Sequence, residues 1–368
     1  EDVLPARVAV YRPWDLDSLC ASGQIEWVGI DALAGGDGRI ALFCSEDERM
    51  PVPPPGHAEG GMAAAIRDRL AERGPAFFRD IVRDVGGYPG ELLDALWSLV
   101  WAREVTNDTL EPLRSRLRAN AQTHRRGRDP RRTPSPGLPG SEGRWSLRRA
   151  SSTPLDPTEK ATRLVRCLLE RYGIIVREVA DAEGVPGGFS AVYPVLRAME
   201  ESGAIRRGYF VRGHGGTQFA LPGADERLRS VRDPDDDADA IVLAATDPAS
   251  PWGSILPWPE RRDPSLARPL RTAGARVILW QGSLVGWMPR SDPSLLTFLP
   301  EGPTGPVAAR AMARALVRHA QRLRLPVLLI AAIDGAPAAE GETGRAFLEA
   351  GFVATGGGLM LKRRAQPA

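Results

Sequence analysis

The chain has few of the residues that build metal centres and disulfide frameworks. It contains 3 cysteines and 4 histidines among 368 residues, and all seven are scattered. No CxxC or HxxxH spacing and no cluster of histidine and cysteine occurs in it. We therefore expect neither a structural zinc site nor a catalytic metal site in this chain.

Long apolar runs are also lacking. No stretch approaches the roughly 20 apolar residues that a membrane-spanning helix needs, and no secretory signal pattern opens the sequence. We expect a cytoplasmic protein without a membrane partner.

The nucleotide-binding pattern GxxxxGK[ST] is absent as well, so we expect no cofactor in this chain.

The sequence has no large excess of charge of either sign. Lysine and arginine number 48 and aspartate and glutamate 46, which gives a net charge of +2. Bulk charge therefore does not indicate a partner. The distribution is uneven, because arginines crowd residues 119–152 and an acidic run begins at Asp233. With 43% hydrophobic residues, the chain is long enough for two to four domains with buried cores.

What the sequence does contain is a unit that recurs three times. Each copy has a short amphipathic helix, a Gly or Arg break, and a strand that carries aromatic or basic residues. The copies lie at Leu16–Phe43, Leu92–Val105 and, most completely, Val192–Leu221. A helix followed by a two-stranded wing is the second half of a winged-helix module. Several such modules in series predict a protein that lies along nucleic acid.

These patterns predict an α+β protein with tandem winged-helix domains followed by a β-barrel-like α+β domain. The predicted parts are a partial winged helix (helix and wing) at 1–50, a winged-helix domain at 51–118, a basic Pro/Gly/Arg-rich connector at 119–152, a winged-helix domain at 153–232 and the β-barrel-like C-terminal domain at 233–368. The connector is either a solvated linker or a phosphate-binding segment, and Trp145 within it favours partial order. The first module lacks its front half, so we expect a larger parent polypeptide.

The third module shows the helix-turn-helix pattern most fully. Asp156 precedes a predicted helix at Thr158–Tyr172, and a second helix is expected at Ile174–Ala180. The recognition helix is predicted at Phe189–Ser202, with Pro194 in its first turn. A wing follows, and its turn is predicted at Gly213–Gly216.

Candidate DNA-binding residues lie on that helix and wing. They are Ser190, Tyr193, Arg197, Arg206, Arg207, Tyr209, Arg212, His214 and Gln218. Alternation along the strand places Arg206 and Arg207 on opposite faces. Basic wing residues typically contact phosphate or enter the minor groove. The alternative is a solvated edge strand whose charges prevent aggregation.

Two long segments resemble the C-terminal region of the long helicase-related proteins, which are bacterial superfamily II DNA helicases. One runs from ERYGIIVREVADAEGVPGGFSAVYPVL through LAATDPASPWGSILPWP, and the other is the opening LPARV with YRPWDLDSLCASGQIEWVG. The resemblance implies tandem winged helices, a β-barrel module, DNA repair, a helicase core in the same polypeptide and self-association into a homo-oligomer. ATP and Mg²⁺ would then belong to a motor outside this chain.

The resemblance extends to the winged-helix DNA glycosylases of the AlkZ type. A glycosylase needs a carboxylate to stabilise an oxocarbenium-like sugar and aromatic groups to hold an unstacked base. Asp247 is the candidate catalytic residue, and Trp252 and Trp258 are candidates for a base pocket. The alternative is a structural Asp-Pro turn and a tryptophan-bearing loop that packs between domains. The Gln-x-Gln or Gln-x-Asp signature of that type has its nearest match at Gln24–Glu26, which we interpret as an ordinary strand.

Three hypotheses follow for the function. The first is a DNA-binding and oligomerisation region that serves a helicase on single- or double-stranded DNA. The second is a DNA glycosylase that removes uracil or an alkylated base, and the third is an oligomerisation scaffold. Arginines at near-helical spacing from Arg310 to Arg324 form either a DNA-facing stripe or a solvated face that pairs with an acidic neighbour.

Overall fold

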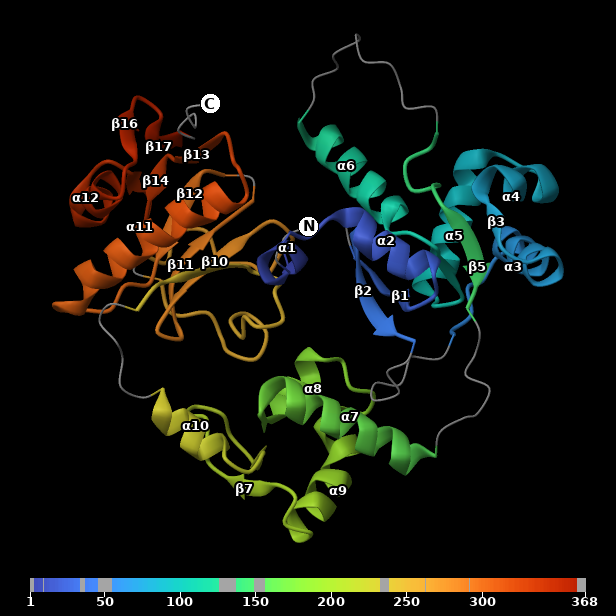
Figure 1. Ribbon diagram of the computed structural model, residues 1–368, viewed down its shortest axis with the longest axis horizontal. Coiled ribbons are helices and arrows are strands. Elements are labelled where there is room, and N and C mark those ends of the chain that lie inside the picture. Colours follow the sequence, from blue (N-terminus) through green and yellow to red (C-terminus); the bar gives the residue numbers. More distant parts are fainter. Residues whose placement is uncertain are drawn as a thin grey trace. The chain divides into compact units, whose positions relative to one another are not determined.

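The computed structural model describes residues 3–8, 10–33, 37–45, 55–125, 137–148, 156–231, 238–261, 263–290 and 292–362. Figure 1 shows their helices and strands. The chain forms two compact units. We call residues 11–171 the N-terminal unit, and residues 1–10 with 172–368 the C-terminal unit.

The N-terminal unit begins with the helix and hairpin that the sequence predicts. Helix α2 spans Pro13–Ala21, and strands β1 (Ile25–Leu33) and β2 (Asp37–Cys44) pair antiparallel. Trp27 on β1 is fully buried and donates its indole N–H to the carbonyl of Thr109 at 3.0 Å. This bond ties the hairpin to the next module. Residues 34–36 between the two strands lie outside the described residues.

A complete winged-helix order follows. Its elements are α3 (Gly61–Arg73), β3 (Ala76–Phe77), α4 (Phe78–Val85), α5 (Pro89–Trp101), β4 (Val105–Asn107) and β5 (Arg144–Leu147). The strands lie in the order β3-β5-β4, so the last strand is central. Helix α6 (Glu111–Arg125) lies between β4 and β5 in the sequence.

The structure differs from the prediction of a connector over residues 119–152. Strand β5 falls within that segment and carries Trp145, which is fully buried and meets Trp97 edge-on at 5.9 Å. Arg148 is buried too, and its guanidinium donates to Glu26 and to the carbonyl of Arg103, at 2.9 Å each. Arg148 therefore holds the module together and is not a free phosphate ligand. Residues 126–136 and 149–155 lie outside the described residues.

The last winged helix begins at α7 (Pro157–Tyr172), whose residues up to Arg171 are counted in the N-terminal unit. Its first turn is capped by Asp156 as predicted: the Thr158 amide donates to Oδ2 at 2.8 Å. The following elements are β6 (Ile174–Ile175), α8 (Arg177–Ala182), α9 (Gly188–Glu201), β7 (Arg206–Gly208), β8 (Gln218–Ala220) and α10 (Ala224–Ser230). The sheet order β6-β8-β7 repeats that of the preceding module.

Two local predictions in this module are wrong. Ile174 and Ile175 form a strand rather than the start of a helix, because they pair with Ala220 and Phe219 of β8, and β-branched residues favour that state. Pro194 lies in the second turn of α9 rather than the first, since the helix begins at Gly188.

The rest of the C-terminal unit is rich in strands. Its elements are β9 (Ile241–Ala244), β10 (Arg276–Trp280), β11 (Ser283–Met288), β12 (Ser294–Thr297), α11 (Thr304–Arg322), β13 (Val327–Ile330), β14 (Ala332–Ile333), β15 (Ala336–Pro337), α12 (Gly341–Glu349), β16 (Val353–Thr355) and β17 (Gly358–Lys362). One sheet has six strands in the order β15-β14-β12-β11-β10-β9, and a second has three in the order β13-β17-β16.

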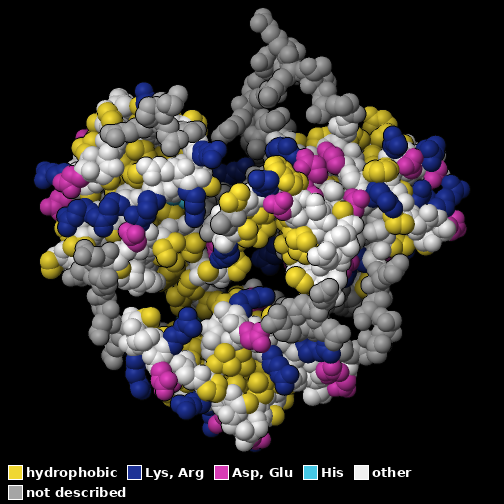
Figure 2. Space-filling view, viewed as in Figure 1, with side chains coloured by type: hydrophobic (Ala, Val, Ile, Leu, Met, Phe, Trp, Pro, Cys, Tyr) yellow, Lys and Arg dark blue, Asp and Glu magenta, His cyan; other side chains and the backbone are white. Residues whose placement is uncertain are grey.

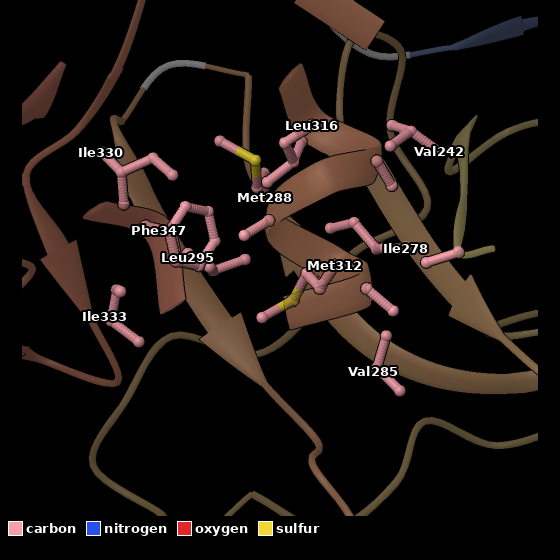
Figure 3. Close-up of a cluster of buried hydrophobic side chains, with 14 of the residues drawn as sticks. Val242, Ile278, Val285, Met288, Leu295, Met312, Leu316, Ile330, Ile333 and Phe347 are labelled. Atoms are coloured by element: carbon pink, nitrogen blue, oxygen red, sulfur yellow. The ribbon is translucent and has the colours of Figure 1, made fainter. Parts of the chain in front are cut away.

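Helix α11 covers one face of the six-stranded sheet. Met312 and Leu316 from the helix pack with Ile278, Leu295 and Phe347 in a common core (Figure 3). The helix lies close to β11, because a Cβ on Gly286 would come within 2.7 Å of the Met312 sulfur. Alternation along β10 then directs Val277 to the opposite face, where it joins Trp287 and Leu296 in a second buried cluster.

The mixed α+β class is confirmed, but closure into a barrel is not. Among the described strands, the two sheets are open, with β15 and β9 at the edges of the larger one. Within the described residues, no helix combines the length and the apolar character that crossing a membrane would need.

Candidate nucleic-acid interface

The wing of the last winged helix consists of two strands of three residues, β7 and β8, joined by residues 209–217. Arg206 pairs with Ala220, and Gly208 pairs with Gln218. Gly213 and Gly216 have φ values of 83° and 86°, which only glycine adopts freely. The predicted turn is thus confirmed, within a longer loop.

Gln218 holds this loop from inside, which corrects its prediction as a DNA contact. Its side chain is fully buried. The amide oxygen accepts the N–H groups of Phe210 and Val211 at 2.8 Å each, and the amide nitrogen donates to the carbonyls of Val211 at 3.0 Å and His214 at 3.1 Å. One buried side chain therefore satisfies four backbone groups of the loop.

His214 is also turned inward, contrary to its prediction as a DNA contact. Its side chain is only 6% exposed, and Nδ1 lies 3.1 Å from Oε2 of Glu178 on α8. The loop backbone is fixed here by Gln218, so the imidazole faces the helix-turn-helix rather than solvent. Gly213 and Gly215 on either side of it are exposed.

The remaining wing candidates point outward. Tyr209 is 92% exposed, and Arg212 is exposed beside it. Arg206 and Arg207 are more than half exposed, and they lie nearest to Asp225 of α10 at 3.9 Å and to Glu200 of α9 at 3.8 Å. Their different neighbours confirm that the two arginines occupy opposite faces.

The recognition-helix candidates differ from one another. Ser190 is exposed. Arg197 is exposed and pairs with Glu201 one turn later at 2.8 Å. Tyr193 is half-buried between Phe189 at 5.9 Å and Phe219 at 6.0 Å, so its ring belongs partly to the core. Of the three, Ser190 and Arg197 offer the accessible polar groups.

Asp247 is fully buried and held by an arginine from the start of the chain. Both carboxylate oxygens accept hydrogen bonds from the guanidinium of Arg7 in α1 (Val3–Arg7), and one also accepts the Ala249 amide at 2.8 Å. Burial opposes ionisation of the carboxyl, but the bonds from Arg7 and Ala249 outweigh it and lower the pKa of Asp247 below its usual value.

A second arginine fixes the backbone of the same loop. Arg271 donates to the carbonyls of Asp247 at 3.0 Å and Ser250 at 2.7 Å, and its own burial lowers its pKa. The carboxylate is thus committed to bonds within the protein. This arrangement favours the structural alternative for the Asp-Pro motif over a catalytic one.

Trp252 and Trp258 pack on the apolar face of the sheet that α11 leaves open. Both contact the cluster containing Val277 and Trp287. Trp258 lies against Gly253, where a Cβ would come within 2.4 Å of its ring. The two rings therefore pack against the sheet.

The described residues include no group of three or more His, Cys, Asp or Glu side chains placed to hold a metal ion. The candidate interface consists of basic, aromatic and hydroxyl side chains on α9 and the wing. Such groups contact phosphates and base faces.

The fold and this surface define a protein with repeated winged-helix modules. Residues 154–240 and residues 1–45 each match a winged-helix domain of the large helicase-related protein. The chain belongs to that family and corresponds to its C-terminal region, as the resemblance of its two long segments predicts.

Two curated relatives are similar along most of the chain. One, from Mycolicibacterium smegmatis, is named Lhr helicase/probable uracil glycosylase and is 38% identical over 353 residues, or 90% of this chain and 23% of the relative. The other, from Escherichia coli, is named Lhr helicase/uracil glycosylase and is 34% identical over 384 residues, or 97% of this chain and 24% of the relative. The chain thus spans about a quarter of their length.

The buried amide of Gln218 gives a prediction about the wing. Gln218→Leu should free the loop, since two backbone amides and two carbonyls lose their partner, at a cost of about 1–3 kcal/mol for each group that stays buried and unsatisfied. Hydrogen exchange at Phe210 and Val211 should accelerate. The control Tyr209→Ala removes an exposed ring and should leave those amides protected; unchanged exchange in Gln218→Leu would refute the bracing role.

The pair between Arg7 and Asp247 predicts a dependence of stability on pH. The pKa of Asp247 is lowered in the folded state from about 3.9 when unfolded. Its contribution is therefore complete above that pH and lost as the pH falls through the folded value. Since Arg7 is 40% exposed, Asp247→Asn should lower the free energy of unfolding at pH 7 by only about 1–3 kcal/mol.

Chemical denaturation at pH 7 and at pH 3 would measure this effect. The difference in the free energy of unfolding between the unaltered protein and Asp247→Asn should shrink at pH 3. The exposed control Asp292→Asn should differ little from the unaltered protein at either pH. Equal stability of Asp247→Asn and the unaltered protein at pH 7 would contradict the structural role.

Proposed function

We propose that this chain binds DNA for a helicase core in the same polypeptide. The observation that carries the proposal is the last wing, which exposes Arg206, Arg207 and Arg212 together with the ring of Tyr209. The names of the two relatives support a helicase as the parent protein.

The wing arginines are available to phosphates. The nearest acidic oxygens to Arg206 and Arg207 are 3.9 and 3.8 Å away, and both arginines are largely exposed. Exposed ion pairs of this kind contribute little, so a phosphate can replace them at small cost. Guanidinium groups form paired hydrogen bonds to phosphate oxygens, and these contacts fix the position of the protein on DNA without reading sequence.

Tyr209 adds a different type of contact. A ring that is 92% exposed beside basic residues can stack on an unpaired base, because every base presents an aromatic face. Ser190 and Arg197 on α9 offer polar contacts on the recognition helix.

Further parts of the proposal rest on the family. We place ATP and Mg²⁺ in the helicase core, because the nucleotide-binding pattern is absent from this chain. We also propose, from the family to which the chain belongs, a role in DNA repair, self-association into a homo-oligomer and a cytoplasmic location. The barrel-like closure of the last domain and its similarity to AlkZ-type glycosylases are proposals as well.

The wing gives a quantitative prediction. Arg206→Gln with Arg207→Gln should weaken DNA binding and reduce the slope of log affinity against log salt by about 0.7–0.9 for each phosphate that the variant no longer neutralises. Fluorescence anisotropy with a labelled oligonucleotide across a salt series would measure both. The matched control is Arg227→Gln with Arg229→Gln on α10, two exposed arginines of the same module. A wing variant that behaves like this control would contradict the proposal.

A second candidate function is removal of uracil from DNA, which the names of both relatives favour. The winged-helix surface would hold the strand while a base leaves the stack, at an energy cost that is least in single strands. Asp247 stays the predicted catalytic carboxylate for this reaction, and Trp252 and Trp258 stay the predicted base pocket. The burial of Asp247 under Arg7 favours a positioning role instead.

One assay separates these roles. Abasic sites are counted after incubation with single- and double-stranded uracil DNA, for the unaltered protein, Asp247→Asn and Arg7→Gln. If Arg7 and Asp247 form a structural pair, both variants should produce fewer abasic sites to a similar extent, in proportion to the fraction of protein that stays folded. A catalytic carboxylate predicts a loss of about 10²–10⁴-fold in Asp247→Asn alone. No abasic sites with any substrate would remove the glycosylase and leave DNA binding.

A further inference from the structure

Helix α11 has an unusual composition for a surface helix. Its 19 residues, TGPVAARAMARALVRHAQR, include no aspartate or glutamate. Arg310, Arg314, Arg318 and Arg322 follow one another at intervals of four residues. Residues four apart are neighbours on a helix, so these arginines form a continuous line, which we call the α11 stripe.

The fold turns the α11 stripe to solvent. The opposite face of the helix, with Ala308, Met312, Ala315 and Leu316, is buried in the core against the sheet. All four arginines are exposed. Figure 2 shows a row of basic side chains over the part of the view where Figure 1 draws α11.

Only part of the stripe is neutralised within the described residues. Arg318 pairs with Asp239 at 3.0 Å and donates to the carbonyl of Ala240 at 3.2 Å. Arg322 lies 3.5 Å from Nδ1 of His319. Arg310 and Arg314 form no hydrogen bond or ion pair with any residue that the structure describes. The first half of the stripe thus offers two positive charges that have no ionic partner among the described residues.

A line of like charges is unfavourable for the helix itself. Arginines at i and i+4 repel one another, whereas a solvated helix face usually alternates signs and gains from that pairing. The repulsion disappears when an anion with many charges lies along the line. The composition of α11 therefore suits contact with a polyanion.

We propose that the α11 stripe binds the phosphate backbone of a nucleic-acid strand, as a second surface besides the wing. Successive arginines lie four residues apart, which is about 6 Å along the helix axis, so they can contact successive phosphates. Each guanidinium forms paired hydrogen bonds to phosphate. The stripe has no aromatic or amide groups in its line, so it binds without reading sequence. The choice of DNA as the nucleic acid rests on the proposed function.

The test replaces the two unpaired arginines, Arg310→Gln with Arg314→Gln. DNA affinity should fall, and the salt slope should decrease by about 0.7–0.9 per phosphate contact. The melting temperature should stay the same or rise, because the variant removes repulsion within α11. A matched control, Arg268→Gln with Arg345→Gln, removes two exposed arginines from the same part of the chain and should leave the slope unchanged.

The outcomes separate this inference from the proposed function. If the stripe variant binds DNA with the affinity and slope of its control while the wing variant binds weakly, the inference is overturned and the wing proposal stands. If neither variant weakens binding, both fail.

Discussion

The wing depends on one buried amide. Strands β7 and β8 have three residues each, too few to satisfy the backbone of the residues that join them (209–217). Gln218 supplies partners from inside, with two acceptor and two donor bonds. Because an unpaired buried amide is costly, this side chain fixes the loop. It thereby fixes the direction in which Tyr209 and Arg212 point.

Hydrogen bonding divides the arginines discussed above into two groups with different tasks. Arg148, Arg271 and Arg7 meet carboxylates or carbonyls and hold segments that are distant in sequence. The wing arginines and the α11 stripe stay exposed, and their acidic neighbours are distant or few within the described residues. Since the net charge is only +2, it is this placement, and not the amount of charge, that produces surfaces suited to a polyanion.

Local patterns made much of the fold predictable. The Asp156 cap located α7, apolar periodicity located α9, and the glycines at Gly213 and Gly216 located the wing turn. Strand β5 was not predictable, because arginine and proline around it mask a strand whose only signal is Trp145. For the site, alternation along the strand predicted the opposite faces of Arg206 and Arg207, which have different neighbours in the structure. The inward turn of Gln218 and the pairing of Arg7 with Asp247 depend on tertiary contacts, which sequence spacing does not encode.

Hydrogen–deuterium exchange with and without an oligonucleotide tests the DNA-binding role of the wing most directly. We expect added protection in the peptide that covers residues 205–217, where the exposed wing side chains would meet phosphates and a base. Peptides from the buried faces of the sheets should not change. Protection elsewhere in the chain, with the wing peptide unaffected at low salt, would contradict this role.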